Sequence, residues 1–122
     1  MSTPEGRVKS KLKKYLKDKG ILYFMPVSNG MGTHGVSDFI ACVPVEITAD
    51  MVGQKMGVFT AIEAKAEGLR GKENRGASPL QMTFLAKVMS HYGLGMIADC
   101  VEDVAEVLDA IEFECAKSKE QA

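Results

Sequence analysis

The sequence GVFTAIEAK, at residues 57–65, decides the fold expected for this chain. Its first six residues are mostly apolar or β-branched, a composition typical of a strand that is buried for most of its length. The strand ends on two charged residues, Glu63 and Lys65. Because side chains two apart on a strand share a face, a carboxylate and an ammonium group project together from an apolar strand. This polar end is the first candidate for a functional site.

The segments on either side of this strand predict an α/β fold. In chain order we expect a helix from Thr3 to Gly20, strands at 21–24, 38–43 and 57–65, a helix at 78–91, a strand at 96–98 and a helix at 102–116. Between them lie a glycine-rich loop at 28–35, a connection at 44–56 with a short helix capped by Thr48, and a basic loop at 66–77. The order αβββαβα predicts one mixed central sheet flanked by helices.

Length and composition indicate one globular domain. The chain has 122 residues, of which 46% are hydrophobic and 25% charged, enough for a single core over residues 1–116 with a short polar tail at 117–122. No apolar run approaches the roughly 20 residues that span a bilayer, and no signal sequence is visible, so we expect a cytoplasmic protein with no membrane partner. The cysteines are widely spaced without a CxxC pair, which favours free thiols over disulfides or a zinc site.

The charge of the chain is unevenly distributed. Fifteen Lys and Arg residues against 16 Asp and Glu give a formal charge of −1. Residues 1–19, however, hold seven basic and two acidic residues, a net +5, whereas residues 99–122 hold eight acidic and two basic residues, a net −6. The first helix therefore presents a basic surface suited to an anionic partner.

A second acid is expected beside the polar end of the central strand. Asp38 opens the preceding strand, and in an antiparallel hairpin it would converge with Glu63 and Lys65. Two carboxylates there favour a hard cation such as Mg²⁺, with the backbone carbonyl of Ala64 as a third oxygen ligand. Lys65 would orient or deprotonate a water and stabilise charge on an attacked phosphate. These parts fit metal-assisted phosphodiester hydrolysis.

Each of these residues also has an ordinary structural interpretation. A Glu/Lys pair at a strand end is commonly a surface ion pair, and Asp38 also suits a turn. Glu5, a further candidate ligand, is an acid in the first turn of a helix, where it complements the dipole. Gln81 completes the capping-box pattern Ser78-x-x-Gln81, and a side chain folded onto its cap is unavailable to a substrate. Both roles of Gln81 stay open.

The ordered motifs resemble a known nuclease family. Gly35-Val36-Ser37-Asp38, Glu63-Ala64-Lys65 and Ser78-Pro79-Leu80-Gln81 are together similar to the VRR-NUC (virus-type replication-repair nuclease) family of the PD-(D/E)xK superfamily, in its stand-alone phage and bacterial form. The resemblance implies a restriction-endonuclease-like core with Asp38, Glu63 and the Ala64 carbonyl as metal ligands, Lys65 as the catalytic lysine, Gln81 as a further catalytic-site residue and Glu5 as the first-helix acid. One departure is Ser37, which stands where the superfamily has proline.

The resemblance also implies a reaction and its partners. We expect a Mg²⁺-dependent DNA endonuclease, with Mn²⁺ able to substitute, that acts on duplex or branched DNA such as four-way junctions and works as a homodimer. Backbone contacts to DNA are expected from basic residues of the first helix and of the loop at 66–77, namely Lys9, Lys13, Arg70, Lys72 and Arg75. The alternatives are a non-catalytic DNA-binding or assembly module on the same fold, or a small homodimeric scaffold that binds no nucleic acid.

Overall fold

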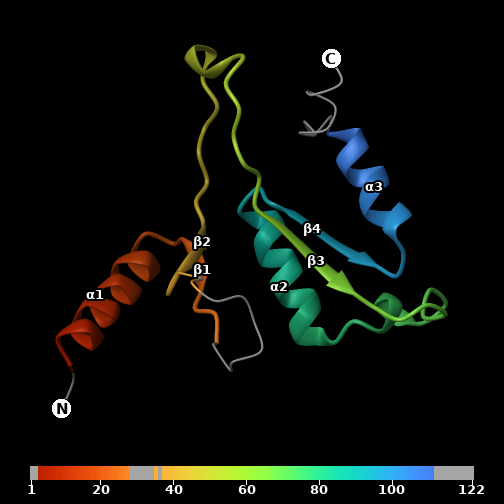
Figure 1. Ribbon diagram of the computed structural model, residues 1–122, viewed down its shortest axis with the longest axis horizontal. Helices are drawn as coiled ribbons and strands as arrows, with labels where there is room; N and C mark the ends of the chain where they lie inside the picture. Colours follow the sequence, from red (N-terminus) through yellow and green to blue (C-terminus); the bar gives the residue numbers. More distant parts are fainter. Residues whose placement is uncertain (1–2, 28–34, 36, 112–122) are drawn as a thin grey trace. The chain divides into compact units, whose positions relative to one another are not determined.

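The computed structural model describes residues 3–27, 35 and 37–111 (Figure 1). Its elements are α1 (Pro4–Asp18), β1 (Leu22–Phe24), β2 (Ile40–Cys42), the 3₁₀ turn η1 (Ala49–Met51), β3 (Thr60–Ala64), the 3₁₀ turn η2 (Glu73–Gly76), α2 (Pro79–Ser90), β4 (Leu94–Ala98) and α3 (Val101–Ala110). The fold is mixed α/β, and the expected order αβββαβα is confirmed. The glycine-rich segment 28–34 and the chain beyond Ile111, including the expected tail, lie outside the described residues.

The described chain forms two compact units. Unit 1 takes the described residues between 3 and 60 and between 87 and 94, and unit 2 takes those between 61 and 86 and between 95 and 111. The boundary passes through β3, α2 and β4, so each unit contains part of these elements. Each unit is described below by itself.

Helix α1, in unit 1, begins where its capping residues predict. The Thr3 hydroxyl accepts a hydrogen bond from the Gly6 amide at 2.9 Å, and Pro4 occupies the first helical position, where its missing N–H costs nothing. After the helix ends, Gly20 adopts the left-handed conformation at φ 69°, which glycine reaches without steric cost. The start and the stop of α1 were therefore both predictable from local sequence.

Strands β1 and β2 form an antiparallel pair in unit 1. The register places Leu22 opposite Cys42 and Phe24 opposite Ile40. Cys42 is buried, and its thiol donates to the backbone carbonyl of His91 at 3.5 Å. Both described cysteines, Cys42 and Cys100, are free thiols, as expected.

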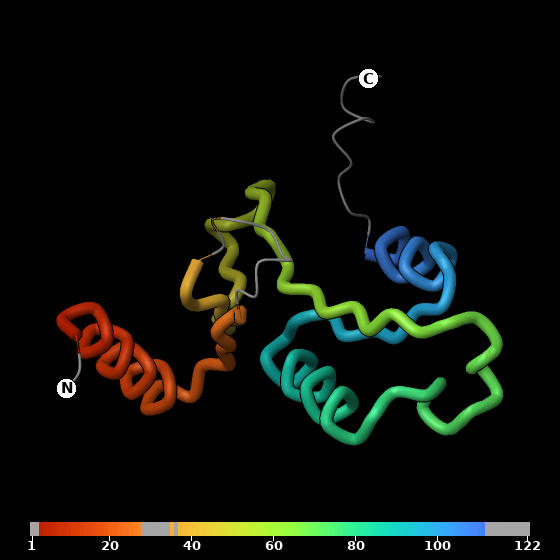
Figure 2. Tube along the Cα trace, turned by 60° about the horizontal axis from the view of Figure 1, so that its bottom comes forward, coloured from red at the N-terminus to blue at the C-terminus, as the bar shows by residue number. Residues whose placement is uncertain are grey.

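Strands β3 and β4 pair in parallel. The Leu94 amide donates to the Phe59 carbonyl at 2.9 Å, and further along both strands the Lys65 amide donates to the Ala98 carbonyl at 2.8 Å. Helix α2 makes the connection between them, as a βαβ unit requires. Figure 2 shows this arrangement, with α2 and α3 on opposite sides of the strand pair.

A close approach of the backbone explains Gly93, which precedes β4. A Cβ at this position would lie 2.8 Å from the Phe59 carbonyl oxygen and 2.8 Å from Cγ1 of Val88. Any side chain at residue 93 would therefore push the start of β4 away from the carbonyl that it pairs with.

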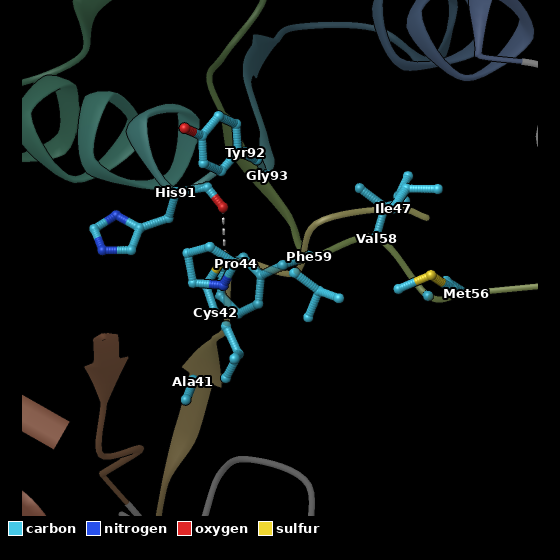
Figure 3. Close-up of a pocket in the computed structure, with 13 residues that line it drawn as sticks. Ala41, Cys42, Pro44, Ile47, Met56, Val58, Phe59, His91, Tyr92 and Gly93 are labelled. Atoms are coloured by element: carbon cyan, nitrogen blue, oxygen red, sulfur yellow. Dashed lines mark hydrogen bonds between the residues drawn. The ribbon is translucent and has the colours of Figure 1, made fainter. Parts of the chain in front are cut away.

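The expectation of one central sheet is wrong for the described residues, which form two sheets of two strands each. Strand β2 pairs with β1, and β3 pairs with β4. The two halves of the connection from Val43 to Phe59 form no strands with each other, so β2 and β3 are not joined as the expected hairpin. Pro44, which has no N–H to donate, lies two residues after the end of β2 (Figure 3). The short helix expected in this connection is confirmed as η1, but the Thr48 side chain makes no capping hydrogen bond.

Few of the described residues are buried apolar residues. They are Cys42 and Val88 in unit 1 and Ala77, Leu85 and Ala98 in unit 2. The sequence places Leu80 with Leu85 and Val88 on the inward face of α2, yet Leu80 is 83% exposed, one residue after the helix begins. Strand β3 alternates between exposed and half-buried residues rather than being mostly buried, because β4 is its one partner in the described chain. No described helix is both long and apolar enough to cross a bilayer.

Candidate active site

Unit 2 holds a polar group built around the Lys65 amine. Lys65 directly follows β3, and its Nζ lies 3.4 Å from Oε1 of Glu63, two residues earlier on the same face of the strand. The two side chains are only 19% and 27% exposed. The predicted pairing of a carboxylate with an ammonium group at the end of this strand is therefore present, and it is more enclosed than an ordinary surface ion pair.

Gln81 of α2 completes this group while also capping its own helix. Its Oε1 accepts a hydrogen bond from the Ser78 amide at 2.8 Å and another from Lys65 Nζ at 3.0 Å. In return, the Gln81 amide donates to the Ser78 hydroxyl at 3.1 Å, which closes the capping box. One carbonyl oxygen with two lone pairs thus serves both the cap and the lysine. The capping role is confirmed, and a role of Gln81 toward a substrate stays a prediction.

Unit 1 holds a second group, formed around Lys9 of α1. Lys9 Nζ lies 3.7 Å from Oε1 of Glu5 and 3.8 Å from Oδ1 of Asp38. Glu5 and Asp38 are well exposed, at 74% and 60% of their side chains. The structure thus brings two of the candidate acids together, with a lysine between them that offsets their repulsion.

The candidate residues fall into these two groups, one in each unit. Glu63, Lys65 and Gln81 lie in unit 2 with Ala64, the last residue of β3, whereas Asp38 lies in unit 1. The convergence of Asp38 with Glu63 stays a prediction.

The arginines of the loop at 66–77 make contacts that the sequence reasoning missed. Arg70 donates to the Asp103 carboxylate and lies 2.8 Å from Oδ1 of Asp99. Arg75 donates to the Ile97 carbonyl at 3.0 Å and to Oδ2 of Asp103 at 3.3 Å. The loop is thereby fastened to the end of β4 and the first turn of α3.

This network shifts the pKa values of two groups, Asp103 and Arg70. The hydrogen bond from Arg70 holds the pKa of the Asp103 carboxyl well below its usual range. The same bond raises the pKa of the Arg70 guanidinium above its already high ordinary value. Both groups are therefore charged at neutral pH, which stabilises the attachment of the loop to α3.

The basic residues proposed to contact DNA differ in what surrounds them. Arg70 and Arg75 are engaged with Asp99 and Asp103, whereas Lys13 and Lys72 lie on the exposed surface of α1 and of the loop. Phosphate contacts by all of these residues stay a prediction. The acids Asp99 and Asp103, at or just before the start of α3, are the sequence feature that could have predicted these arginine contacts. A count of charge over residues 99–122 does not single them out.

The same acids form a cluster of potential metal ligands. The ligand atoms of Asp99, Cys100 and Asp103 lie within 4.8 Å of one another, the one such trio of His, Cys, Asp or Glu found in the described chain. The Arg70 guanidinium already lies against all three, with Cys100 Sγ at 3.3 Å from Nη2. A cationic side chain thus takes the place that a metal ion would need, so the cluster gives no support to a Mg²⁺ site.

Comparisons of this chain with protein-family models, curated proteins and solved structures found no match. A functional assignment therefore depends on the side chains and contacts described above.

Proposed function

We propose that this chain is a metal-dependent DNA endonuclease with a PD-(D/E)xK core, in which Lys65 is the catalytic lysine. The observation that carries the proposal is the enclosed Lys65 amine, 3.4 Å from the Glu63 carboxylate and 3.0 Å from the Gln81 carbonyl oxygen. An isolated surface ion pair at the end of a strand needs no third partner from a helix. A lysine fixed by two acceptors from different elements suits a site that must place a proton donor or acceptor accurately.

Lys65 has two tasks in the proposed reaction. Its ammonium group stabilises the negative charge that develops on the attacked phosphate, and its amine form accepts a proton from the attacking water. Gln81 supports both tasks as a neutral acceptor that holds Nζ in one position without adding charge. Ser78 fixes Gln81 in turn through the capping box.

The oxygen donors available here fit a hard divalent cation. The Glu63 carboxylate and the Ala64 carbonyl supply two such oxygens, and Asp38 is the third proposed ligand. When bound there, Mg²⁺ or Mn²⁺ would polarise the phosphate and lower the pKa of a bound water. Glu5 is the further candidate, because Lys9 already brings its carboxylate near that of Asp38.

The proposed substrate is duplex or branched DNA. The net charge of +5 over residues 1–19 favours phosphate contacts, which give affinity without reading sequence. Four-way junctions enter the proposal through the resemblance of the motifs to VRR-NUC nucleases.

Cleavage assays test this proposal directly. Linear duplex, flap and four-way junction DNA are each incubated with the chain in Mg²⁺ and in Mn²⁺. Lys65→Ala is expected to reduce the cleavage rate by about 100-fold or more, because it removes the proposed catalytic lysine, and Asp38→Asn by a similar factor, because it weakens a proposed ligand of the metal. DNA binding, measured by anisotropy, is expected to persist in both variants.

Lys87→Ala is the matched control, because Lys87 is an exposed lysine of α2 outside the Lys65 group. Its cleavage rate is expected to equal that of the unmodified chain. Salt-sensitive DNA binding without turnover in either metal would favour the non-catalytic binding module. Equal cleavage by the Lys65 and Lys87 variants would remove Lys65 from the mechanism.

A further inference from the structure

The side chain of Arg75 attaches the loop before α2 to an edge of β4. Its Nη1 donates to the Ile97 carbonyl at 3.0 Å. The neighbouring carbonyl, that of Ala98, accepts from the Lys65 amide at 2.8 Å on the side of β3. Because successive carbonyls along a strand point in opposite directions, Ile97 offers its oxygen at the other edge of β4, which pairs with no strand in the described chain. Arg75 therefore takes the place of a strand partner there.

Arg75 also holds the turn in which its own backbone lies. Its Nη1 lies 3.3 Å from Oδ2 of Asp103, and that oxygen accepts from the Asp99 amide at 3.1 Å. The backbone of Asn74 and Arg75 is left-handed, with φ 50° and 52°. Two successive non-glycine residues in this conformation are costly, so other contacts must hold the turn. The Arg75 side chain, which is 33% exposed, supplies two of those contacts.

This turn leads directly into the residues that hold the Lys65 amine. The Ala77 amide is hydrogen-bonded back into the turn at 2.9 Å, and Ala77 is buried. Ser78 comes next, and its amide and hydroxyl form the capping box with Gln81. The same Gln81 oxygen accepts from Lys65 Nζ at 3.0 Å. A short stretch of chain and one capping box thus connect Arg75 with the amine.

The contact between Lys65 and Gln81 is therefore attached to β4 on both sides. Lys65 is attached by its own amide, at Ala98. Gln81 is attached through the loop and Arg75, at Ile97. We propose that Arg75 is a positioning residue for the Lys65 amine, because its bond to β4 sets where Gln81 meets that amine. The expected effect on cleavage rests on the proposed function, whereas the expected effect on the amine itself does not.

Chemical labelling measures the position of the Lys65 amine without a substrate. The chain is treated briefly with acetic anhydride, and mass spectrometry gives the acetylation of Lys65 relative to that of Lys87, an exposed lysine of α2. The Lys65 side chain is 19% exposed and held by two acceptors, so its acetylation is expected to be the slower of the two. Arg75→Met keeps an unbranched side chain without a donor. It is expected to raise the ratio by about 5-fold, the factor that corresponds to the loss of one hydrogen bond.

Arg75→Lys tests whether the donor itself matters. A lysine at this position can donate to the Ile97 carbonyl, although it lacks the fork of the guanidinium, so the ratio is expected to return to within about 2-fold of the unmodified chain. Urea unfolding checks that both variants fold. An unchanged ratio in folded Arg75→Met would overturn the proposal, and so would an equal rise in the methionine and lysine variants.

Arg70→Gln is the matched control. Arg70 shares the Asp103 carboxylate with Arg75, and its other contacts are with Asp99 and Cys100. The control is expected to leave the acetylation of Lys65 unchanged, because the bond to β4 is still present. A rise in Arg70→Gln equal to that in Arg75→Met would assign the effect to the attachment of the loop to α3 and would overturn the proposal.

The cleavage assay separates positioning from DNA binding. Arg75→Met is expected to lower kcat by about 10-fold or more with KM for DNA nearly unchanged, because a displaced catalytic group slows the reaction without weakening binding. A raised KM at unchanged kcat would identify Arg75 as a phosphate contact and overturn the proposal. If the unmodified chain cleaves no DNA, the proposed function fails, and the acetylation ratios alone decide whether Arg75 positions the amine.

Discussion

At the scale of single residues, Gln81 helps to fix the position of the Lys65 amine. Its carbonyl oxygen is shared between the Ser78 amide and Lys65 Nζ, so the position of the lysine is tied to the start of α2. A neutral acceptor at this place orients the amine without adding a charge to the group. The identity of residue 81 therefore matters separately from the stability of the helix.

Gln81→Glu separates these two roles. Glutamate completes a Ser-x-x-Glu capping box as well as glutamine does, so the free energy of unfolding is expected to stay within about 0.5 kcal/mol of the original. The added carboxylate replaces the neutral acceptor of Lys65 Nζ with a charged one, and cleavage is expected to fall by roughly 10- to 100-fold. Urea unfolding and the cleavage rate are the measurements.

Gln81→Met is the companion variant, because it removes the acceptor altogether. It is expected to lose about 1 kcal/mol of stability with the cap and to lose activity as well. Unchanged cleavage in both variants would limit Gln81 to capping.

At the scale of elements, the first turn of α3 anchors the loop that runs from Lys65 to Ser78. Asp103 accepts hydrogen bonds from Arg70, from Arg75 and from the Asp99 amide. The loop also contains Asn74 and Arg75 in left-handed backbone conformations, at φ 50° and 52°, which non-glycine residues seldom adopt. The contacts of Arg75 with Ile97 and Asp103 help to hold this turn in place.

This anchor predicts a pH dependence of stability. Because the folded-state pKa of Asp103 is lowered, its contribution is present above the ordinary Asp pKa of about 4 and is lost as the pH falls below that value. Urea unfolding between neutral pH and about pH 2.5 is therefore expected to show a difference between the original chain and Asp103→Asn that is largest at neutral pH and shrinks in acid. Asp109→Asn, an exposed acid on the same helix, is the control and should show no such pH-dependent difference.

Sequence alone predicted the helices and strands better than it predicted which of them pair or contact each other. The Thr3 cap, the capping box at Ser78 and Gln81 and the Glu63–Lys65 pair depend on residues within four positions of each other, so local chemistry decided them. The pairing of β2 with β1 and the contacts of Arg70 and Arg75 with Asp103 depend on residues far apart in the chain, for which composition gives no register. A count of charges therefore predicts that these arginines contact DNA, because it cannot show that Asp103 of α3 lies beside them.

At the scale of the whole molecule, the net charge of −1 is the sum of regions whose charges are neutralised by ion pairs to different extents. Part of the negative charge of residues 99–122 neutralises Arg70 and Arg75 within unit 2. The positive charge of α1 is offset only in part, by short-range pairs such as Lys14 with Asp18 at 2.8 Å. We therefore expect the exposed lysines to contribute more to DNA affinity than the two arginines.

The salt dependence of DNA binding tests this expectation. Lys13→Ala and Lys72→Ala are each expected to reduce the slope of log affinity against log salt concentration by about 0.9, the value for one lost phosphate contact on duplex DNA. Arg70→Gln is expected to leave the slope nearly unchanged. A larger loss of slope for Arg70→Gln than for either lysine variant would mean that Arg70 leaves Asp103 to bind phosphate.

The parallel pairing of β3 with β4 has a consequence for synthesis on the ribosome. Strand β3 is made first, and its partner emerges only after the loop and α2 have been translated, an interval of a few seconds at roughly 5–20 residues per second. During that interval the nascent chain displays an unpaired strand edge directly after the apolar connection at residues 43–59. Neighbouring ribosomes on one message carry the same segments at staggered stages of synthesis, so the risk of premature association between nascent chains begins before the protein is released.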